Sequence, residues 1–118
     1  MTTDAAACLF CRIANGQIPA KKIHEDDDVV AFHDVNPQAP THVLVIPRRH
    51  IPTLDDLTPA DAATIGTTIV RATEIARSLG LQQDGYRVVI NNGEAAGQTV
   101  FHIHVHVLGG RAFGWPPG

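Results

Sequence analysis

Near its C-terminal end the chain reads His102-Ile103-His104-Val105-His106-Val107-Leu108. Successive side chains of a β-strand point to opposite faces of its sheet. In a strand predicted over residues 100–108, the three histidines therefore share one face, and Ile103, Val105 and Val107 share the other. The apolar face can pack beneath a helix. This stretch predicts a half-buried strand with a row of imidazoles on its second face.

A row of imidazoles indicates chemistry, because an ordinary polar strand face carries residues such as Thr, Lys or Glu. Near pH 7 a neutral imidazole has one lone pair and one N–H group. The lone pair can attack phosphorus and form a covalent intermediate, while a neighbouring imidazole donates a proton to the leaving group. Zinc binding by all three histidines and a merely polar strand face are the alternatives.

The segment that leads into this strand agrees with chemistry at a phosphate. It runs from Asn91 to Thr99 and contains Gly97. Glycine allows a close approach of the backbone, so the amides that follow it can bind phosphate oxygens. The side chains of Gln98 and Thr99 add further donors. An ordinary turn is the alternative, since glycine is common in turns.

Other elements follow from local patterns. Strands are expected to begin at Ile23 and to cover residues 29–33, 42–46 and 86–91, and a short helix is expected over residues 8–14. A long helix begins after Thr58, with Pro59 at its first position and Asp61 as the acid of a capping box. Its apolar stripe, expected to lie on the sheet, consists of Ala62, Ile65, Ile69, Ala72, Ala76 and Leu79.

Length and connections bound the fold class. The 118 residues suit one domain, 1–118. Most strands are joined by short turns, which favours an antiparallel meander with helices on one face, an α+β arrangement. A doubly wound parallel sheet would need more crossover helices than the sequence contains.

Charge and hydropathy exclude several classes of protein. The net charge of −3 argues against a general nucleic-acid binder, which usually has a basic face. No apolar run is long enough to span a membrane. The segment Met1–Ala7 contains Asp4 and has no features of a signal peptide, so we expect a cytoplasmic protein.

The histidine stretch resembles the defining motif of the histidine triad superfamily, in which three histidines alternate with apolar residues. The C-terminal Trp115-Pro116-Pro117-Gly118 is similar to the ending of its Hint branch. Further segments that resemble this branch are Cys8–Ile13, Ile18–Ala20, Ala31–Asp34, Pro37–His42, Val45–Pro47, Gly97-Gln98 and Leu108–Arg111.

The resemblance implies an activity. Hint proteins are purine nucleoside phosphoramidases that also hydrolyse aminoacyl-adenylates, and they release a nucleoside monophosphate without an organic cofactor. By this likeness His104 is the nucleophile, and His106 contacts the phosphate and the leaving group. His102 and His42 complete the histidine cluster and orient its protons. The alternatives are a dinucleoside polyphosphate hydrolase or phosphorylase from a sister branch, and a regulatory module that binds a nucleotide or zinc.

The resemblance also assigns a nucleotide-binding set, with Asp34 at the ribose hydroxyls. Thr99 stands where close relatives often have serine, so the preferred leaving group could shift. The base-pocket positions are Phe32, His33 and Val35, and the phosphate-side positions are Asn91, Gly97, Gln98, Thr99 and Val100.

The family fold implied by the resemblance is a five-stranded antiparallel sheet with one long and one short helix. Two copies form a homodimer with a ten-stranded sheet. Trp115 is then expected to reach toward the partner's active site, and an ordinary interface aromatic is the alternative, since tryptophan is enriched at interfaces.

Cys8 and Cys11 have the spacing of metal ligands, but two ligands do not make a structural zinc site. Resemblance to several bacterial histidine triad proteins implies that His50 and His102 supply the other two. Two free cytosolic thiols are the alternative. A zinc ligand cannot freely relay protons, so the two roles implied for His102 conflict.

Overall fold

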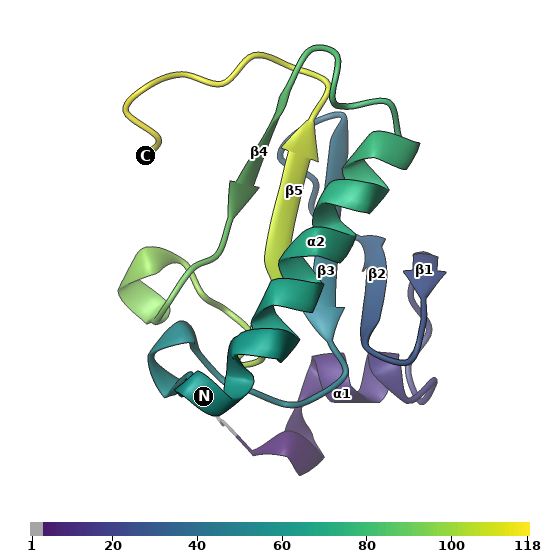
Figure 1. The fold of residues 1–118 in the computed structure, drawn as a ribbon, viewed down its shortest axis with the longest axis vertical. Coiled ribbons are helices and arrows are strands. Elements are labelled where there is room, and N and C mark those ends of the chain that lie inside the picture. The colour runs from purple at the N-terminus through teal and green to yellow at the C-terminus, as the bar shows by residue number, and fades with distance from the viewer. Residues whose placement is uncertain (1–3) are drawn as a thin grey trace.

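The computed structural model describes residues 4–118, which form one five-stranded antiparallel sheet with a helix on each face (Figure 1). The sequence-based prediction of an α+β fold with a long and a short helix is confirmed. Residues 1–3, which begin the segment examined for a signal peptide, lie outside the described residues. The strands are β1 (Lys22–Glu25), β2 (Val29–His33), β3 (Thr41–Pro47), β4 (Tyr86–Val89) and β5 (Val105–Gly109).

The strand order β1-β2-β3-β5-β4 differs from the predicted meander. After β3 the chain crosses the sheet through the long helix and enters the edge strand β4. It then returns as β5 between β4 and β3. The histidine stretch therefore joins the interior of the sheet, with a neighbouring strand on each side.

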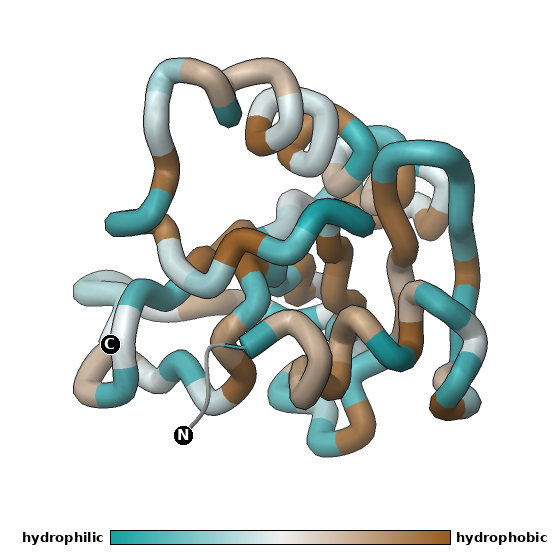
Figure 2. The backbone as a smooth tube through the Cα atoms, turned by 90° about the horizontal axis from the view of Figure 1, so that it is seen from below, coloured by the Kyte–Doolittle hydropathy of each residue, from teal (hydrophilic) through white to brown (hydrophobic). Residues whose placement is uncertain are grey.

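The two helices lie on opposite faces of the sheet, whereas the sequence analysis expected one face. The short helix α1 (Leu9–Ala14) packs with Phe32 and Leu44, and the long helix α2 (Ala62–Ser78) packs with the alternate strand residues. Apolar segments gather in the middle of the molecule, and its outer loops are hydrophilic (Figure 2). The prediction failed because nothing local says which face a short helix covers.

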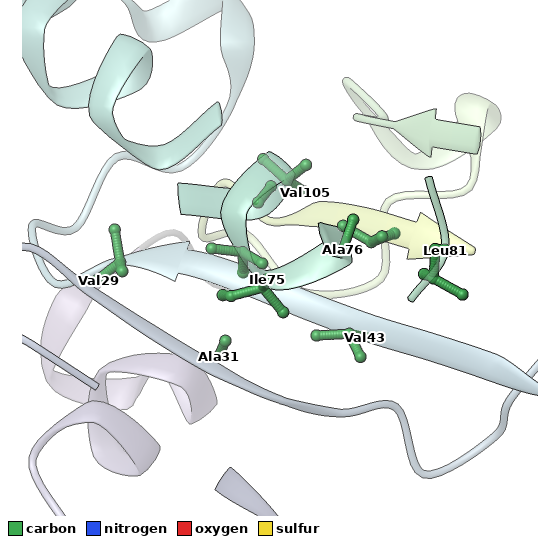
Figure 3. Packing of buried hydrophobic residues seen from close by; sticks show 10 residues of the cluster. Val29, Ala31, Val43, Ile75, Ala76, Leu81 and Val105 are labelled. Carbon is green, nitrogen blue, oxygen red and sulfur yellow. The ribbon is translucent and has the colours of Figure 1, made fainter. Parts of the chain in front are cut away.

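The long helix begins close to its predicted start. Thr58 and Asp61 form the predicted capping box, but on a short 3₁₀ turn (Pro59–Asp61) that precedes α2. Ala72, Ile75 and Ala76 then pack against the strand valines (Figure 3).

The apolar stripe of α2 is rotated relative to the prediction. Ile69 and Leu79 are 39% and 41% exposed, while Thr68 and Ile75 are buried. Burial of Thr68 is possible because its hydroxyl donates to the carbonyl of Thr64 at 2.8 Å. No helix within residues 4–118 is long and apolar enough to span a bilayer.

The last strand is shorter than predicted, since β5 begins at Val105 rather than at residue 100. The preceding residues turn toward the segment that follows β3, where the N–H of Ile103 donates to the carbonyl of Ile51 at 2.8 Å. The predicted alternation nevertheless holds for the apolar side chains. Val105 and Val107 are fully buried in the core beneath α2, and Ile103 is 2% exposed.

Candidate active site

His104 immediately precedes β5, contacts Phe10 of α1 and is held in one tautomer. Its Nδ1 is 2.7 Å from the carbonyl oxygen of His102, which can only accept, so Nδ1 carries the proton. The ring of Phe10 meets that of His104 edge to face, with 5.0 Å between centroids. Burial lowers the pKa of His104, although the bond to the carbonyl opposes this. His104 is therefore a neutral imidazole whose Nε2 has a free lone pair.

His42 and His106 form a chain of imidazoles beside His104. The antiparallel register places His42 opposite Leu108, so His106 is its diagonal neighbour across β3 and β5. The N–H of Gln38 donates to Nδ1 of His42 at 3.0 Å. The proton of neutral His42 is therefore on Nε2, which donates to Nδ1 of His106 at 2.9 Å.

These hydrogen bonds leave the proton of neutral His106 on Nε2. This atom is buried and has no hydrogen-bond partner within residues 4–118. Burial lowers the pKa of His106 to about 4, and the neighbouring His104 and His42 act in the same direction. Burial also lowers the pKa of His42, while the nearby carboxylate of Asp34 opposes the shift. Asp34 Oδ2 is 3.5 Å from His42 Nε2. His106 thus presents an unused donor beside the lone pair of His104.

Both histidines open into a pocket of about 340 Å³, a volume typical of small-molecule sites. Most of the lining is apolar, and the polar residues in it are Lys21, His33, Asp34, Thr99 and the two histidines. The predicted site residues that line it are Phe32, His33, Asp34, Val35, Gly97, Thr99, Val100, His104 and His106. The sequence analysis missed the apolar wall formed by Leu9, Phe10, Ile13, Ile18 and Leu44. The local sequence does not show whether an apolar residue of a short helix lines a pocket or lies in the hydrophobic core.

Three predicted nucleotide-binding residues are absent from the pocket lining. The side chain of Asn91 lies next to Gly97. A Cβ atom added to Gly97 would lie 3.5 Å from Asn91 Nδ2. Gln98 is buried, and its carboxamide bonds to backbone groups. Trp115 is 84% exposed and lines a separate open depression of about 740 Å³ along β4 and the C-terminal tail. Within one chain, then, Trp115 is not brought to the histidines.

A second cluster brings Cys8, Cys11, His50 and His102 together on the other side of His104. The Nδ1 atom of His102 is 3.4 Å from the sulfur of Cys8, 3.5 Å from that of Cys11 and 3.2 Å from Nδ1 of His50. Nδ1 of His50 is 3.3 Å from the Cys11 sulfur. The imidazole of His102 thus belongs to this cluster and not to the pocket. Its main-chain carbonyl, in contrast, fixes the tautomer of His104.

The geometry of this cluster fits a tetrahedral zinc ion. With Zn–N distances of about 2.0–2.1 Å and Zn–S distances of about 2.3 Å, the tetrahedral edges are about 3.4 Å between nitrogens and about 3.6 Å between nitrogen and sulfur. The observed spacings match these edges. His102 Nε2 donates to the carbonyl of Pro47 at 2.7 Å, which leaves its Nδ1 lone pair directed at the sulfurs. Burial and the Cys8 thiol raise the pKa of Cys11 to about 11, so a cation is needed to hold that thiolate at neutral pH.

Comparison with known proteins identifies the family and the fold. The family model described as the HIT domain matches residues 15–113. An uncharacterised HIT-like protein of Synechocystis is 53% identical over 110 residues, which cover 93% of this chain and 96% of the relative.

Solved structures show the same fold. A HIT family hydrolase from Legionella pneumophila superposes with a TM-score of 0.92 at 49% identity, covering 94% of this chain and 99% of that one. A histidine triad nucleotide-binding protein from Candida albicans gives 0.80 at 31% identity, with 95% and 85% covered. A zinc-bound histidine triad family protein from Mycobacterium smegmatis gives 0.76 at 38% identity, with 98% and 82% covered.

Proposed function

The chain belongs to the HIT domain family, and we propose that it hydrolyses purine nucleoside phosphoramidates and related adenylates through a nucleotidyl-histidine intermediate. The single observation that carries this proposal is the state of His104. Its Nδ1 is locked on the His102 carbonyl, which leaves the Nε2 lone pair free, and His104 lines a pocket together with His106, whose buried Nε2 has no partner within residues 4–118. The Hint-like segments of the sequence favour this substrate class over others in the family.

The lining of the pocket suits the two parts of a purine nucleotide. Its aromatic and aliphatic side chains, including Phe32 and Ile18, can hold a base. Asp34 lines the pocket and lies 3.5 Å from His42, so its carboxylate can accept hydrogen bonds from ribose hydroxyls near the histidines. Because the walls offer few polar groups to the base, we expect AMP and GMP to be released from matching substrates at similar rates.

The first step of the proposed reaction forms a bond between His104 Nε2 and phosphorus and breaks the P–N bond. The leaving nitrogen needs one proton. A bound phosphate raises the pKa of His106 by its negative charge, so the His42–His106 pair can take up a proton from solvent and pass it on through Nε2. A carboxylate leaving group, as in an aminoacyl-adenylate, needs no proton.

The second step returns the protein to its starting state. Water attacks the nucleotidyl phosphorus and the bond to His104 Nε2 breaks, which releases the nucleoside monophosphate. The proton lost by water goes back to the His42–His106 pair. The pair then releases this proton to solvent, so each cycle ends with the same number of protons on the three histidines as it began with.

We also propose that the protein holds a structural zinc ion, with Cys8, Cys11, His50 and His102 as its ligands. A closed four-ligand site of this kind stabilises a fold and leaves no open position for a substrate. The zinc-bound relative from Mycobacterium smegmatis and the spacing of the ligand atoms both support it. Free thiols persist in reducing compartments, so a cytoplasmic location belongs to the same proposal.

We also propose that two copies join along β4, the edge strand next to β5, into a homodimer with a ten-stranded sheet. Val88 is 39% exposed on this strand, and the open depression beside it includes Trp115. Trp115 would then reach the partner's pocket from the C-terminal tail. Light scattering on the purified protein should give twice the mass of one chain, and a monomer would contradict this part of the proposal.

The activity is tested by incubating the purified protein with adenosine 5′-phosphoramidate and, in parallel, with diadenosine tetraphosphate. We expect AMP release from the phosphoramidate and much slower cleavage of the tetraphosphate. Preferential cleavage of the tetraphosphate would instead assign the protein to a sister branch. Tight AMP binding without turnover of either substrate would favour a regulatory module.

A further inference from the structure

Gln98 is a polar side chain that is only 1% exposed, yet it does not line the pocket. Its Nε2 donates to the carbonyls of Pro52 at 2.7 Å and Val100 at 3.1 Å. Its Oε1 accepts the N–H of Gly93 at 2.8 Å. Both amide hydrogens and one oxygen lone pair are thus used on backbone groups, and the side chain cannot contact a substrate.

The loop that Gln98 holds contributes Gly97, Thr99 and Val100 to the pocket. Inside the loop, the N–H of Gly97 donates to the carbonyl of Glu94. The N–H of Gln98 itself donates to the carbonyl of Gly93.

Two amides of the loop remain available. The hydrogen bonds of residues 4–118 include none from the N–H groups of Thr99 and Val100. Both residues line the same pocket as His104 and His106. They are suited to bind the oxygens of a phosphate, as backbone amides in such loops do.

Gln98 connects this loop to the histidine strand through one short segment. The carbonyl of Pro52 accepts from Gln98, and the carbonyl of the preceding Ile51 accepts from the N–H of Ile103 at 2.8 Å. The consecutive carbonyls of Ile51 and Pro52 therefore hold both Ile103, which precedes His104, and the loop that contains Gln98. The distance between the free amides and the His104 lone pair depends on this arrangement.

We infer that Gln98 is a positioning residue that places the N–H groups of Thr99 and Val100 for phosphate oxygens in line with His104. The inference rests on the proposed function, because it requires a nucleotide phosphate in this pocket. It assigns Gln98 a role through the backbone, in place of the direct side-chain contact expected from the sequence.

Two substitutions remove the carboxamide donors in different ways. Gln98→Glu keeps the shape of the side chain but turns a carboxylate toward the Pro52 and Val100 carbonyls, with no hydrogen to donate. Gln98→Met keeps the length, adds no charge and makes no hydrogen bond. Gln82→Glu is the matched control, because it makes the same change at an exposed position.

The test compares binding of AMP with binding of adenosine by calorimetry, well below the melting temperature of each variant. We expect Kd for AMP to rise about tenfold to a hundredfold, the range for losing hydrogen bonds to a charged group. Kd for adenosine should stay within about twofold, because the base and ribose contacts come from other elements. The control should match the wild type, and kcat/KM should fall with an unchanged pH profile.

Several results would overturn the inference. If the Gln98 variants melt earlier but bind AMP as tightly as the wild type, Gln98 only stabilises the fold. An equal loss of affinity for AMP and adenosine would indicate general loosening of the pocket. Should Gln98→Glu fail to fold, Gln98→Met alone decides between these outcomes. A wild-type protein that binds neither ligand would overturn the proposed function itself, and the inference with it.

Discussion

The face of the sheet beneath α2 and the face beneath α1 are built from neighbouring residues of the same strands, yet they differ in kind. Beneath α2 the fully buried strand side chains are small and apolar, such as Val43, Val105 and Val107, each with 0% exposure. Beneath α1 the apolar residues Phe32 and Leu44 give way to a row of buried histidines toward β5.

The difference shows how one alternating strand can serve stability and chemistry at once. On the α2 face, stability comes from apolar area removed from water. On the α1 face, each buried imidazole needs a partner, because an unpaired polar group in the interior is costly. His102 and His104 donate to main-chain carbonyls, and His42 donates to His106. The donor left over is Nε2 of His106, a residue that lines the pocket.

Removal of His104 should have the largest effect on activity of any change on either face. We expect His104→Ala to lower kcat by about 10⁴-fold or more, because the nucleophile is lost. AMP should still bind, since the pocket walls and the phosphate loop are unchanged. Turnover that survives in this variant, measured as AMP release from adenosine 5′-phosphoramidate, would show that the nucleophile lies elsewhere.

A smaller loss of activity should follow from His42→Ala. Without the His42 Nε2–H donor, nothing fixes the tautomer of His106, and the relay has one member fewer. We expect kcat to fall about 10²–10⁴-fold, the usual worth of general acid–base help. His24→Ala is a control at the surface, where His24 pairs with Asp26. If His42→Ala were as active as this control, the relay would have no role.

Loss of the proposed zinc should affect stability more than any single contact on the α2 face. We expect about one zinc per chain by elemental analysis. A strong chelator should lower Tm by about 12 °C or more, equivalent to roughly 3 kcal/mol in a domain of this size. Cys11→Ala should abolish the zinc and the chelator effect together. A protein that contains no metal and does not respond to the chelator would leave two free thiols as the better interpretation.

For the α2 face we expect a loss of stability without a loss of activity, because the side chain of Val105 contributes to packing and not to the pocket. Val105→Ala should lower the free energy of unfolding by about 2 kcal/mol through lost burial and a residual cavity. Its kcat at 25 °C should stay within about threefold of the wild type, because the Val105 side chain packs on the face opposite to the pocket that His104 and His106 line. Urea titration and AMP release measure the two quantities. A large loss of kcat with unchanged stability would show that the two faces are not separable.

Stability should also depend on pH. Burial lowers the pKa of His106 to about 4, below the value of about 6.5 in an unfolded chain. Between these values the unfolded chain binds more protons, so this contribution to stability is fully present above pH 6.5 and is lost as pH falls toward 4. Urea titrations at pH 7.5 and 5 should give a lower midpoint at pH 5. Equal midpoints would mean that His106 is not buried as a neutral group.

Local patterns predicted much of the fold and part of the site. Alternation around His104 and the capping box at Thr58 depend on neighbours within a few residues, so they could be read directly. The side of the sheet that α1 covers could not, because it is decided by contacts with Phe32 and Leu44. The orientation of Gln98 was missed for the same reason, since its partner Pro52 lies 46 residues away.

The most direct test of the central claim is the stereochemistry at phosphorus. The substrate is an adenosine phosphoramidate made chiral with sulfur, and it is hydrolysed in isotopically labelled water. Attack by His104 followed by attack of water inverts phosphorus twice, so the account predicts overall retention of configuration. Inversion would mean that water displaces the leaving group in one step, without a covalent bond to the imidazole row beneath α1.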